Sequence, residues 1–453
     1  MNWEKNKATL DSLLAAGKNS ELRGALMMLN VVDIAEYMTT LETDKMLRLY
    51  RLLPKDISAD VFAYMDDEQR KKLIESIGDK EVGALVDDMF VDDAVDFLEE
   101  MPAGLVRRVL ANVSEDQRKV INRILSYPDN SAGSIMTTEY CEFHEGITAR
   151  EAMKELKRTG IDKETIYTLY VLDAQRKLIG ILPLRKLILA EPDTLIEQLM
   201  DPSFVCVGTL DDQEAVAEVV RKYDLTSVPV VDKEGRMVGI ITADDIMDVI
   251  QDEATEDIEK LAALLPSENE YMKTNVFTLA KNRLPWLLFL MISGIFTGLI
   301  IQHFEDTLTN MAEIGVMLTA CIPMLMGTGG NCGSQSSTLV IRGLAVGEIS
   351  PADTLKILWK ECRVSILVSV VLAAMAMAMQ LFLFRRPFSV ALTVSLAMIG
   401  TVVISKSIGC TLPMLAKKLK LDPALMAAPL ITTIVDTCSL LILFLLATAI
   451  IKI

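Results

Sequence analysis

An aspartate lies inside an otherwise uncharged stretch near the C-terminal end of the chain. Asp436 stands 13 residues after Pro423 and 15 before Ile451. A helix that begins at Pro423 would place the carboxylate roughly 20 Å along its length, near the middle of a bilayer. A carboxylate at that depth needs water, a cation or a basic partner, so an ion pathway is the first hypothesis. Thr432, one helical turn earlier, falls on the same face.

A lysine offers a competing explanation for this acid. Lys406 directly follows the uncharged run of the preceding apolar stretch. An ion pair between Lys406 and Asp436 would make the acid structural and leave it less available to a permeating ion. Because a basic connection follows it, Lys406 could instead extend its ammonium group toward water. From sequence, both alternatives remain open.

A glycine-rich sequence is the second polar feature within the apolar stretches. Pro323 is followed by GTGGNCGSQSST at Gly327–Thr338, which contains four glycines. Such a composition weakens a helix, and exposed amides in lipid would lack hydrogen-bond partners, so this segment must be buried in protein or face water. Tight packing between helices and a polar pore lining are the two interpretations.

Five apolar runs are long enough to cross a membrane as helices. The connections between the second and third runs and between the fourth and fifth are rich in Lys and Arg, which predicts that both are cytoplasmic and that the C-terminus is outside. Arg385 and Arg386, between the third and fourth runs, do not follow this pattern. The runs are Leu284–Phe304, Ile314–Ile341, Val364–Phe384, Pro387–Ser405 and Pro423–Ile451.

The rest of the chain is acidic and has the composition of a folded protein. Of 453 residues, 51% are hydrophobic; residues 281–453 hold 13 basic and 8 acidic side chains, which leaves 32 and 54 for residues 1–280. An acidic body repels phosphates, so we expect no nucleic-acid partner and favour cations. The seven cysteines include no CxxC pair, which argues against a zinc cage or a disulfide framework. The N-terminus shows no signal peptide, which predicts a cytoplasmic body.

Two internal repeats organise this acidic part. Within residues 47–125, LLP, VFA and DEQRK recur 48 residues later as EMP, VLA and EDQRK, a pattern typical of a small helical solenoid. Tyr170–Ile188 then parallels Pro229–Met247, and each copy predicts two short strands and a helix start. The second pair resembles tandem CBS domains, which dimerise and commonly sense adenosine nucleotides. Thr242 and Asp245 match the ribose-contacting positions of that family, whereas Pro183 replaces the threonine in the first copy.

An acidic helix is predicted after the second repeat. Thr242–Leu265 has helical periodicity, and Asp245, Asp248, Asp252 and Glu256 fall on one face of it. A solvated surface is one interpretation. Cations bound between facing acidic stripes would relieve the repulsion within each stripe, which is the other.

The order of these parts resembles the MgtE family of magnesium channels. PMLMGTGGNCGSQSSTLVIRGLA and DPALMAAPLITTIVDT are similar to the two pore signatures of that family. The resemblance implies an α-helical solenoid N domain (1–130), an α/β tandem CBS pair (131–249), a long acidic connecting or plug helix (250–280) and an all-α transmembrane domain of five helices (281–453). It also implies a homodimer in the plasma membrane that imports Mg²⁺.

Site residues follow from the same resemblance. Asp436 of each subunit would face its partner across the pore, supported by Thr432, Gly327, Gly330 and Asn331, with carbonyl groups from a GTGG turn completing the oxygen shell. Cytoplasmic Mg²⁺ would close the channel by bridging acidic positions of the N domain, the CBS pair and the plug helix: Asp92, Asp96, Asp212, Glu214, Asp224, Asp248, Glu253, Glu256, Asp257 and Asp422. Thr242 and Asp245 would hold ATP or another adenosine nucleotide.

Other functions compete with this one. A broader divalent transporter for Co²⁺ or Mn²⁺ is the nearest, although oxygen ligands without nearby His or Cys favour hard ions. A membrane-anchored CBS sensor that conducts nothing would not need a glycine-rich segment paired with a buried acid. An enzyme is not predicted, because the sequence shows no nucleophile–base pair and no phosphate-binding loop.

Overall fold

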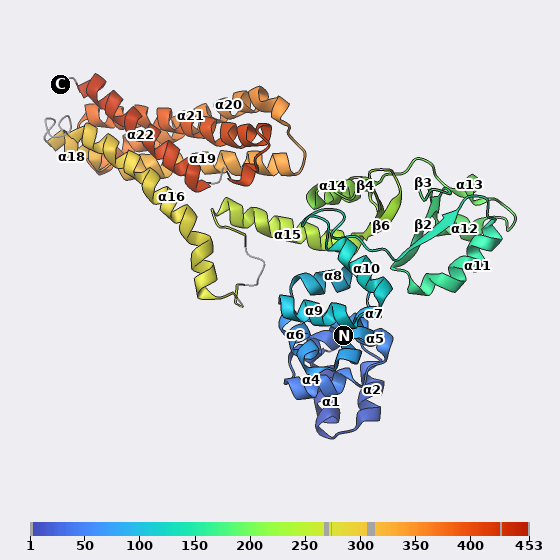
Figure 1. Ribbon diagram of the computed structural model, residues 1–453. Coiled ribbons are helices and arrows are strands. Elements are labelled where there is room, and N and C mark those ends of the chain that lie inside the picture. The colour runs from blue at the N-terminus through green and yellow to red at the C-terminus, as the bar shows by residue number, and fades with distance from the viewer. Residues whose placement is uncertain (1–2, 267–270, 273, 306–312, 426–427, 452–453) are drawn as a thin grey trace. The chain divides into compact units, whose positions relative to one another are not determined.

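The computed structural model describes residues 3–266, 271–272, 274–305, 313–425 and 428–451. They form two compact units, Met1–Gln251 and Asp252–Ile453. The first unit opens with a stack of short helices (Figure 1). These are α1 (Trp3–Ala15), α2 (Asn19–Leu26), α3 (Val31–Thr39), α4 (Thr43–Tyr50), α5 (Lys55–Ala63), α6 (Asp67–Ser76), α7 (Asp79–Asp87), α8 (Val91–Glu99), α9 (Ala103–Asn112) and α10 (Glu115–Ile124).

The first sequence repeat corresponds to two equivalent helix pairs. The LLP and EMP motifs end immediately before α5 and α9, and the two charged motifs open α6 and α10. The side chain of Asp66 accepts a hydrogen bond of 2.9 Å from the backbone N–H of Gln69, and Ser114 caps α10 in the same way at Gln117. Each cap satisfies an N–H group that the helix leaves unpaired. The predicted helical N domain is confirmed.

The second repeat forms two similar α/β modules. In each, the first strand pairs in parallel with the second, which pairs antiparallel with the third, so the orders are β1-β2-β3 and β4-β5-β6. The first module comprises β1 (Tyr140–His144), α11 (Ala149–Thr159), η1 (Gly160–Asp162), β2 (Thr165–Leu172), β3 (Leu178–Pro183), α12 (Leu184–Leu189) and α13 (Ile196–Leu199). The second comprises β4 (Val207–Gly208), α14 (Gln213–Tyr223), β5 (Ser227–Val231), β6 (Met237–Thr242) and the start of α15 (Ala243–Leu261).

The repeated glycine of each module allows another segment to approach closely. A Cβ atom on Gly180 would lie 2.5 Å from the sulfur of Met200, and one on Gly239 would lie 2.7 Å from the sulfur of Met136. Neither position can accept a side chain without displacing the methionine beside it. The matching glycines therefore mark the same packing contact twice, which supports the tandem arrangement.

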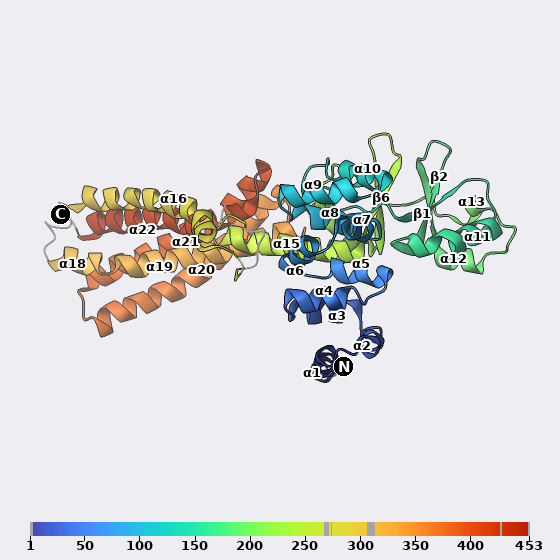
Figure 2. The ribbon, with the colours of Figure 1, turned by 60° about the horizontal axis from the view of Figure 1, so that its bottom comes forward.

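The second unit is a bundle of long helices that run side by side in both views (Figures 1 and 2). Five of its described segments are long and apolar enough to cross a membrane, as predicted. α21 packs against α19, α20 and α22. The elements are α16 (Val276–His303), α18 (Glu313–Thr319), α19 (Ile322–Ala345), η2 (Pro351–Asp353), α20 (Thr354–Ala378), η3 (Met379–Leu383), α21 (Phe388–Lys418), η4 (Pro423–Leu425) and α22 (Ala428–Ile451).

The helices extend beyond the uncharged runs that predict them. α16 begins at Val276, α20 begins at Thr354 and α21 continues to Lys418, so charged residues lie within helices and not in the connections. Charge alone therefore underestimates helix length. The acidic helix α15 ends at Leu261, earlier than its periodicity predicts.

Candidate ion pathway and acidic regulatory sites

The glycine-rich segment is a regular helix, so the predicted GTGG turn is wrong. α19 is continuous from Ile322 to Ala345. Its glycines permit contacts that a side chain would prevent: a Cβ atom on Gly329 would lie 2.7 Å from Cγ2 of Thr401 and 2.8 Å from Cγ1 of Val435. Close packing on α21 and α22 thus compensates for the low helix propensity of glycine, about 1 kcal/mol per residue relative to alanine.

The opposite face of α19 is polar and exposed in the single chain. Gly327, Asn331 and Gln335 recur at intervals of four residues and are exposed, whereas Gly329, Gly330 and the small residues that follow are buried. Nothing lies within 4 Å of a Cβ atom built on Gly327. The structure therefore shows tight packing on one face of this helix, and the exposed polar face is compatible with the second interpretation, a pore lining.

Gly330 brings α19 against the helix that carries the buried acid. A Cβ atom on Gly330 would lie 2.8 Å from Cγ2 of Thr432 in α22. Thr432 donates its hydroxyl hydrogen to the carbonyl oxygen of Pro429 at 2.8 Å, so its oxygen lone pairs face outward as acceptors. Asp436 follows one turn later and is half-buried. Gly330 thus lies against Thr432, and Asp436 lies one turn further along the same helix.

Asp436 lies nearer one end of its helix than the sequence predicts. Pro423 belongs to the separate short helix η4, and α22 begins at Ala428. The carboxylate is therefore roughly 12 Å, and not 20 Å, from the start of α22. No described residue forms a hydrogen bond or an ion pair with it.

Lys406 does not pair with Asp436. It is buried inside α21, and its Nζ lies 3.6 Å from Oε2 of Glu361 in α20 and 3.2 Å from Oγ of Ser336 in α19. Ser336 also donates a hydrogen bond of 2.7 Å to Glu361. Lys406 therefore does form a structural ion pair, but with Glu361 and not with Asp436. The alternative in which its ammonium group extends to water is also wrong, because the side chain is buried. Sequence analysis did not predict Glu361 as the partner, because this residue falls in the connection between the second and third apolar runs.

Arg386, which disagreed with the predicted topology, is bound within the protein. Its Nη1 donates to the carbonyl oxygen of Met317 at 2.9 Å and to Oε1 of Gln380 at 3.0 Å. It also lies 2.8 Å from the sulfur of Cys321. These contacts give Arg386 a structural role between the two spans. Its charge therefore does not count when basic residues on the two sides of the membrane are compared.

The first unit contains a cluster of acidic side chains. Asp92, Asp93 and Asp96 on α8 lie near Asp245 in the first turn of α15. Asp92 and Asp93 also lie near Glu164, which precedes β2. Burial is the largest cause of their raised pKa values, and their mutual repulsion adds to it. The pKa of Asp96 is raised to about 7 and that of Glu164 to about 8, while those of Asp93 and Asp245 reach about 6.

This cluster includes some predicted residues and adds others. Asp92 and Asp96 were predicted, whereas Asp93 and Glu164 were not, because Glu164 is distant in sequence and carries no motif. Asp245 also binds Thr242. Its carboxylate accepts hydrogen bonds from the Thr242 hydroxyl at 2.5 Å and from the Thr242 backbone N–H at 3.2 Å. Thr242 is itself buried. A ribose at this position would have to share these interactions.

Other predicted regulatory residues lie apart from the cluster. Asp212 caps the N-terminus of α14 and accepts a hydrogen bond of 2.9 Å from the N–H of Glu214. Asp224 ends the same helix in the left-handed conformation, with φ of 50°. The two aspartates flank the 11 residues of α14 and are therefore roughly 18 Å apart along its axis. The structure does not bring them together.

A second group of predicted acids surrounds a lysine. In the second unit, Lys260 Nζ lies 2.8 Å from Glu256 and 2.7 Å from Asp422, which precedes η4. Burial, followed by the nearby charge of Asp422, raises the pKa of Asp257. The pKa of Lys260 is also raised: burial acts to lower it, but the hydrogen bonds to Asp422 and Glu256 outweigh burial. Asp248 and Glu253 also lie on α15.

Direct metal coordination is not pre-formed at these positions. Among the described residues, no three Asp, Glu, His or Cys side chains converge closely enough to hold a metal ion. Mg²⁺ commonly keeps several of its waters and contacts one or two carboxylates directly, so the paired acids of α8 and α15 still suit a hydrated ion. Three carboxylates around Lys260, by contrast, already have a positive partner.

Three family descriptions match successive parts of the chain. "MgtE intracellular N domain" matches residues 29–130, "CBS domain" matches residues 132–193 and 196–252, and "Divalent cation transporter" matches residues 322–446. The soluble part of a magnesium transporter has a similar structure, with a TM-score of 0.54 and 33% identity, covering 56% of this chain and 99% of that one. The cytosolic domain of the Mg²⁺ channel MgtE, solved in complex with ATP, gives 0.51 and 34%, covering 54% and 99%.

Full-length relatives show the same relationship. The magnesium transporter MgtE of Thermus thermophilus is 34% identical over 443 residues, which cover 97% of both chains. That of Bacillus subtilis is 33% identical over 437 residues, covering 96% of this chain and 95% of the relative. These relatives are named as transporters and not as enzymes. The chain therefore belongs to the MgtE family of magnesium transporters.

Proposed function

We propose that this chain conducts Mg²⁺ along the faces of α19 and α22 that carry Gly327, Asn331, Thr432 and Asp436. The observation that carries the proposal is the Asp436 carboxylate, which lies within a membrane span and has no described partner. An acid in that setting needs water or a cation. Its neighbours offer oxygen ligands, which Mg²⁺ prefers, and relatives along the whole chain are named magnesium transporters.

Two copies of the chain would complete this pathway. The polar face of α19 and half of the Asp436 side chain remain accessible in one subunit. A two-fold axis beside these groups would place two carboxylates around one ion, which suits a divalent cation. A homodimer is therefore part of the proposal.

The test is Mg²⁺ flux into liposomes that contain the purified protein. Asp436→Asn preserves the shape of the side chain and removes its charge, so flux should fall by roughly tenfold or more. Glu348→Gln, which neutralises an exposed acid outside the spans, should leave flux unchanged. Equal flux in wild type and Asp436→Asn would contradict the proposed pathway. Competition by Co²⁺ or Mn²⁺ in the same assay distinguishes a selective transporter from a broader one.

The proposed orientation places the first unit in the cytoplasm and the C-terminus outside the plasma membrane. Lys356, Lys360 and Arg363 near the start of α20 and the lysines at the end of α21 support it. Import is then driven by the membrane potential, at about 2.3 kcal/mol per charge for each 100 mV.

Regulation by cytoplasmic Mg²⁺ is the second part of the proposal. The acids of α8, Glu164 and Asp245 repel one another, and a bound Mg²⁺ would hold these elements together and favour a closed state. Flux should fall as Mg²⁺ inside the liposomes rises, and Asp96→Asn should shift this inhibition to higher Mg²⁺ concentrations. Inhibition unaffected by the substitution would exclude this cluster.

A nucleotide site at the CBS pair is the third part. The cytosolic domain of a relative was solved with ATP, and the resemblance to CBS domains assigns ribose contacts to Thr242 and Asp245, which are hydrogen-bonded to each other in this chain. Thr242→Ala should weaken ATP binding, measured by calorimetry on the purified chain.

A further inference from the structure

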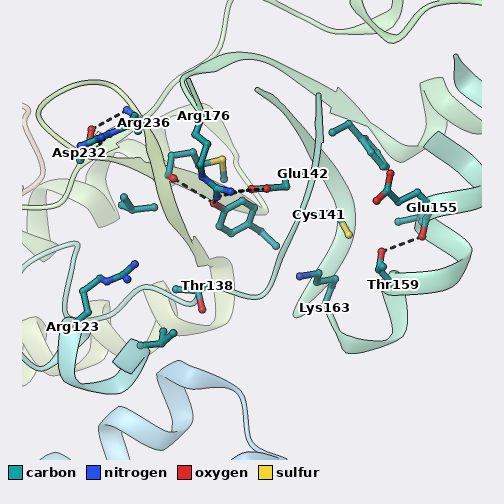
Figure 3. A pocket seen from close by; sticks show the side chains of 16 residues that line it. Arg123, Thr138, Cys141, Glu142, Glu155, Thr159, Lys163, Arg176, Asp232 and Arg236 are labelled. Carbon is teal, nitrogen blue, oxygen red and sulfur yellow. Dashed lines mark hydrogen bonds and ion pairs between the residues drawn. The ribbon is translucent and has the colours of Figure 1, made fainter. Parts of the chain in front are cut away.

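A polar pocket of about 630 Å³ follows the edge strand β1 of the first CBS module (Figure 3). Its walls come from α10, α11 and the turn between β5 and β6. Phe143, Leu156 and Met237 provide apolar surface, and Thr138 lies among the polar groups. The volume is within the range of small-molecule sites, and the combination of apolar walls with a few polar groups is typical of them.

Two of the four cations in the pocket are neutralised by neighbouring acids. Arg176 lies 2.8 Å from Oε2 of Glu142, and Arg236 lies 2.8 Å from Oδ2 of Asp232. Arg176 also donates to the hydroxyl of Tyr140 at 3.1 Å. These interactions fix the two guanidinium groups in the pocket wall.

The other two cations have no such partners. The side chains of Arg123, on α10, and Lys163, just before β2, make no hydrogen bond or ion pair with any described residue. In the view of Figure 3, they lie on opposite sides of the pocket with Thr138 between them. Of the acids that line the pocket, Glu155 lies 3.4 Å from Arg158, and burial raises the pKa of the Cys141 thiol.

This excess of positive charge is unusual in its setting. Residues 1–280 contain 54 acidic and 32 basic side chains, yet four cations and three acids line the pocket, and two of the cations have no described ion-pair partner. Two cations that face one cavity repel each other, and an anion bound between them would relieve that repulsion. Phosphate groups provide several acceptor oxygens for charged donors of this kind.

The pocket is distinct from the nucleotide position at Thr242 and Asp245. Neither residue lines it. Met237, which does, lies at the opposite end of β6 from Thr242, roughly 17 Å away along the strand.

We propose that this pocket binds a small organic phosphate, with Arg123 and Lys163 holding the phosphate groups and the apolar wall contacting the organic part. Because α10 supplies Arg123 and the first CBS module supplies Lys163, the ligand would link the helical N domain to the CBS pair. Binding should therefore also raise the unfolding temperature of this part of the protein.

The test is calorimetry on the full chain in detergent, without Mg²⁺, using inorganic pyrophosphate and ATP as probes. Pyrophosphate should bind wild type, and Arg123→Ala/Lys163→Ala should weaken binding at least roughly tenfold. Arg123→Lys/Lys163→Arg keeps both charges and should retain most of the affinity. ATP, measured in the Thr242→Ala/Asp245→Ala background, should bind more tightly than pyrophosphate because it also contacts the apolar wall.

A matched control separates this site from general electrostatic attraction. Arg221→Ala/Lys222→Ala removes two exposed positive charges from α14, outside the pocket, and should leave binding unchanged. Thermal unfolding of each variant without ligand establishes that it is folded. The proposal is overturned if wild type fails to bind millimolar pyrophosphate. It is also overturned if the pocket and control variants lose the same affinity.

Discussion

Charged side chains inside the spans have opposite roles according to their partners. Lys406 and Glu361 neutralise each other in a buried contact that also includes Ser336. Asp436 has no described partner and remains half-buried. A buried pair is compensated within the protein, whereas a lone carboxylate must be compensated from outside it. Asp436, and not Lys406 or Glu361, is therefore the group that we propose contacts a passing cation.

Removing one member of the buried pair should expose this difference. Lys406→Met leaves the Glu361 charge without its cation, so the free energy of unfolding in detergent should fall by about 3–5 kcal/mol. Lys406→Met/Glu361→Gln removes both charges and should recover most of that loss. Equal destabilisation of the single and double variants would show that the two side chains do not interact.

At the scale of the element, α19 combines two functions that a sequence pattern cannot separate. Its buried glycines allow close contact with α21 and α22, and its exposed residues present polar groups one helical turn apart. The same glycine content therefore serves packing on one face and accessibility on the other.

Two alanine substitutions in α19 distinguish these faces. Gly329→Ala would place a Cβ atom 2.7 Å from Thr401, so it should lower the free energy of unfolding by about 1–3 kcal/mol. Gly327→Ala meets no atom within 4 Å and should maintain or raise stability, because alanine favours the helix. Denaturant unfolding in detergent measures both. Equal destabilisation would mean that the contacts of Gly329 do not limit the packing.

At the scale of the whole molecule, acidity in the first unit links folding to pH. The pKa values of Asp96 and Glu164 rise to about 7 and about 8 because burial disfavours their charged forms. In the unfolded chain such groups titrate near pH 4. Between these limits the folded state binds more protons than the unfolded state, so stability is highest at low pH and falls as the pH rises toward 8.

Thermal unfolding without Mg²⁺ should show this dependence. The unfolding temperature of the first unit should decrease between about pH 5 and pH 8, since the native carboxyl groups lose their protons over that interval. Asp96→Asn should flatten the curve, and Mg²⁺ should raise the unfolding temperature most at pH 8. A curve that rises with pH would contradict the raised pKa values of the cluster.

The sequence by itself determined the architecture, because repeat spacing, strand patterns and uncharged runs reflect local structure. The 48-residue repeat predicted the helix pairs, the repeat of Tyr170–Ile188 in Pro229–Met247 predicted the two α/β modules, and five apolar runs predicted the spans. The sequence also led to Asp436 as a candidate site residue, since an acid in an apolar run is visible without knowledge of its neighbours.

Only the tertiary structure decided which charges meet. Lys406 pairs with Glu361 and not with Asp436, and Glu164 joins Asp92, Asp93 and Asp96 from a distant part of the chain. Such contacts depend on the rotation of each helix about its axis and on which helices are neighbours. Packing of side chains across the whole bundle sets both quantities, so no local pattern encodes them.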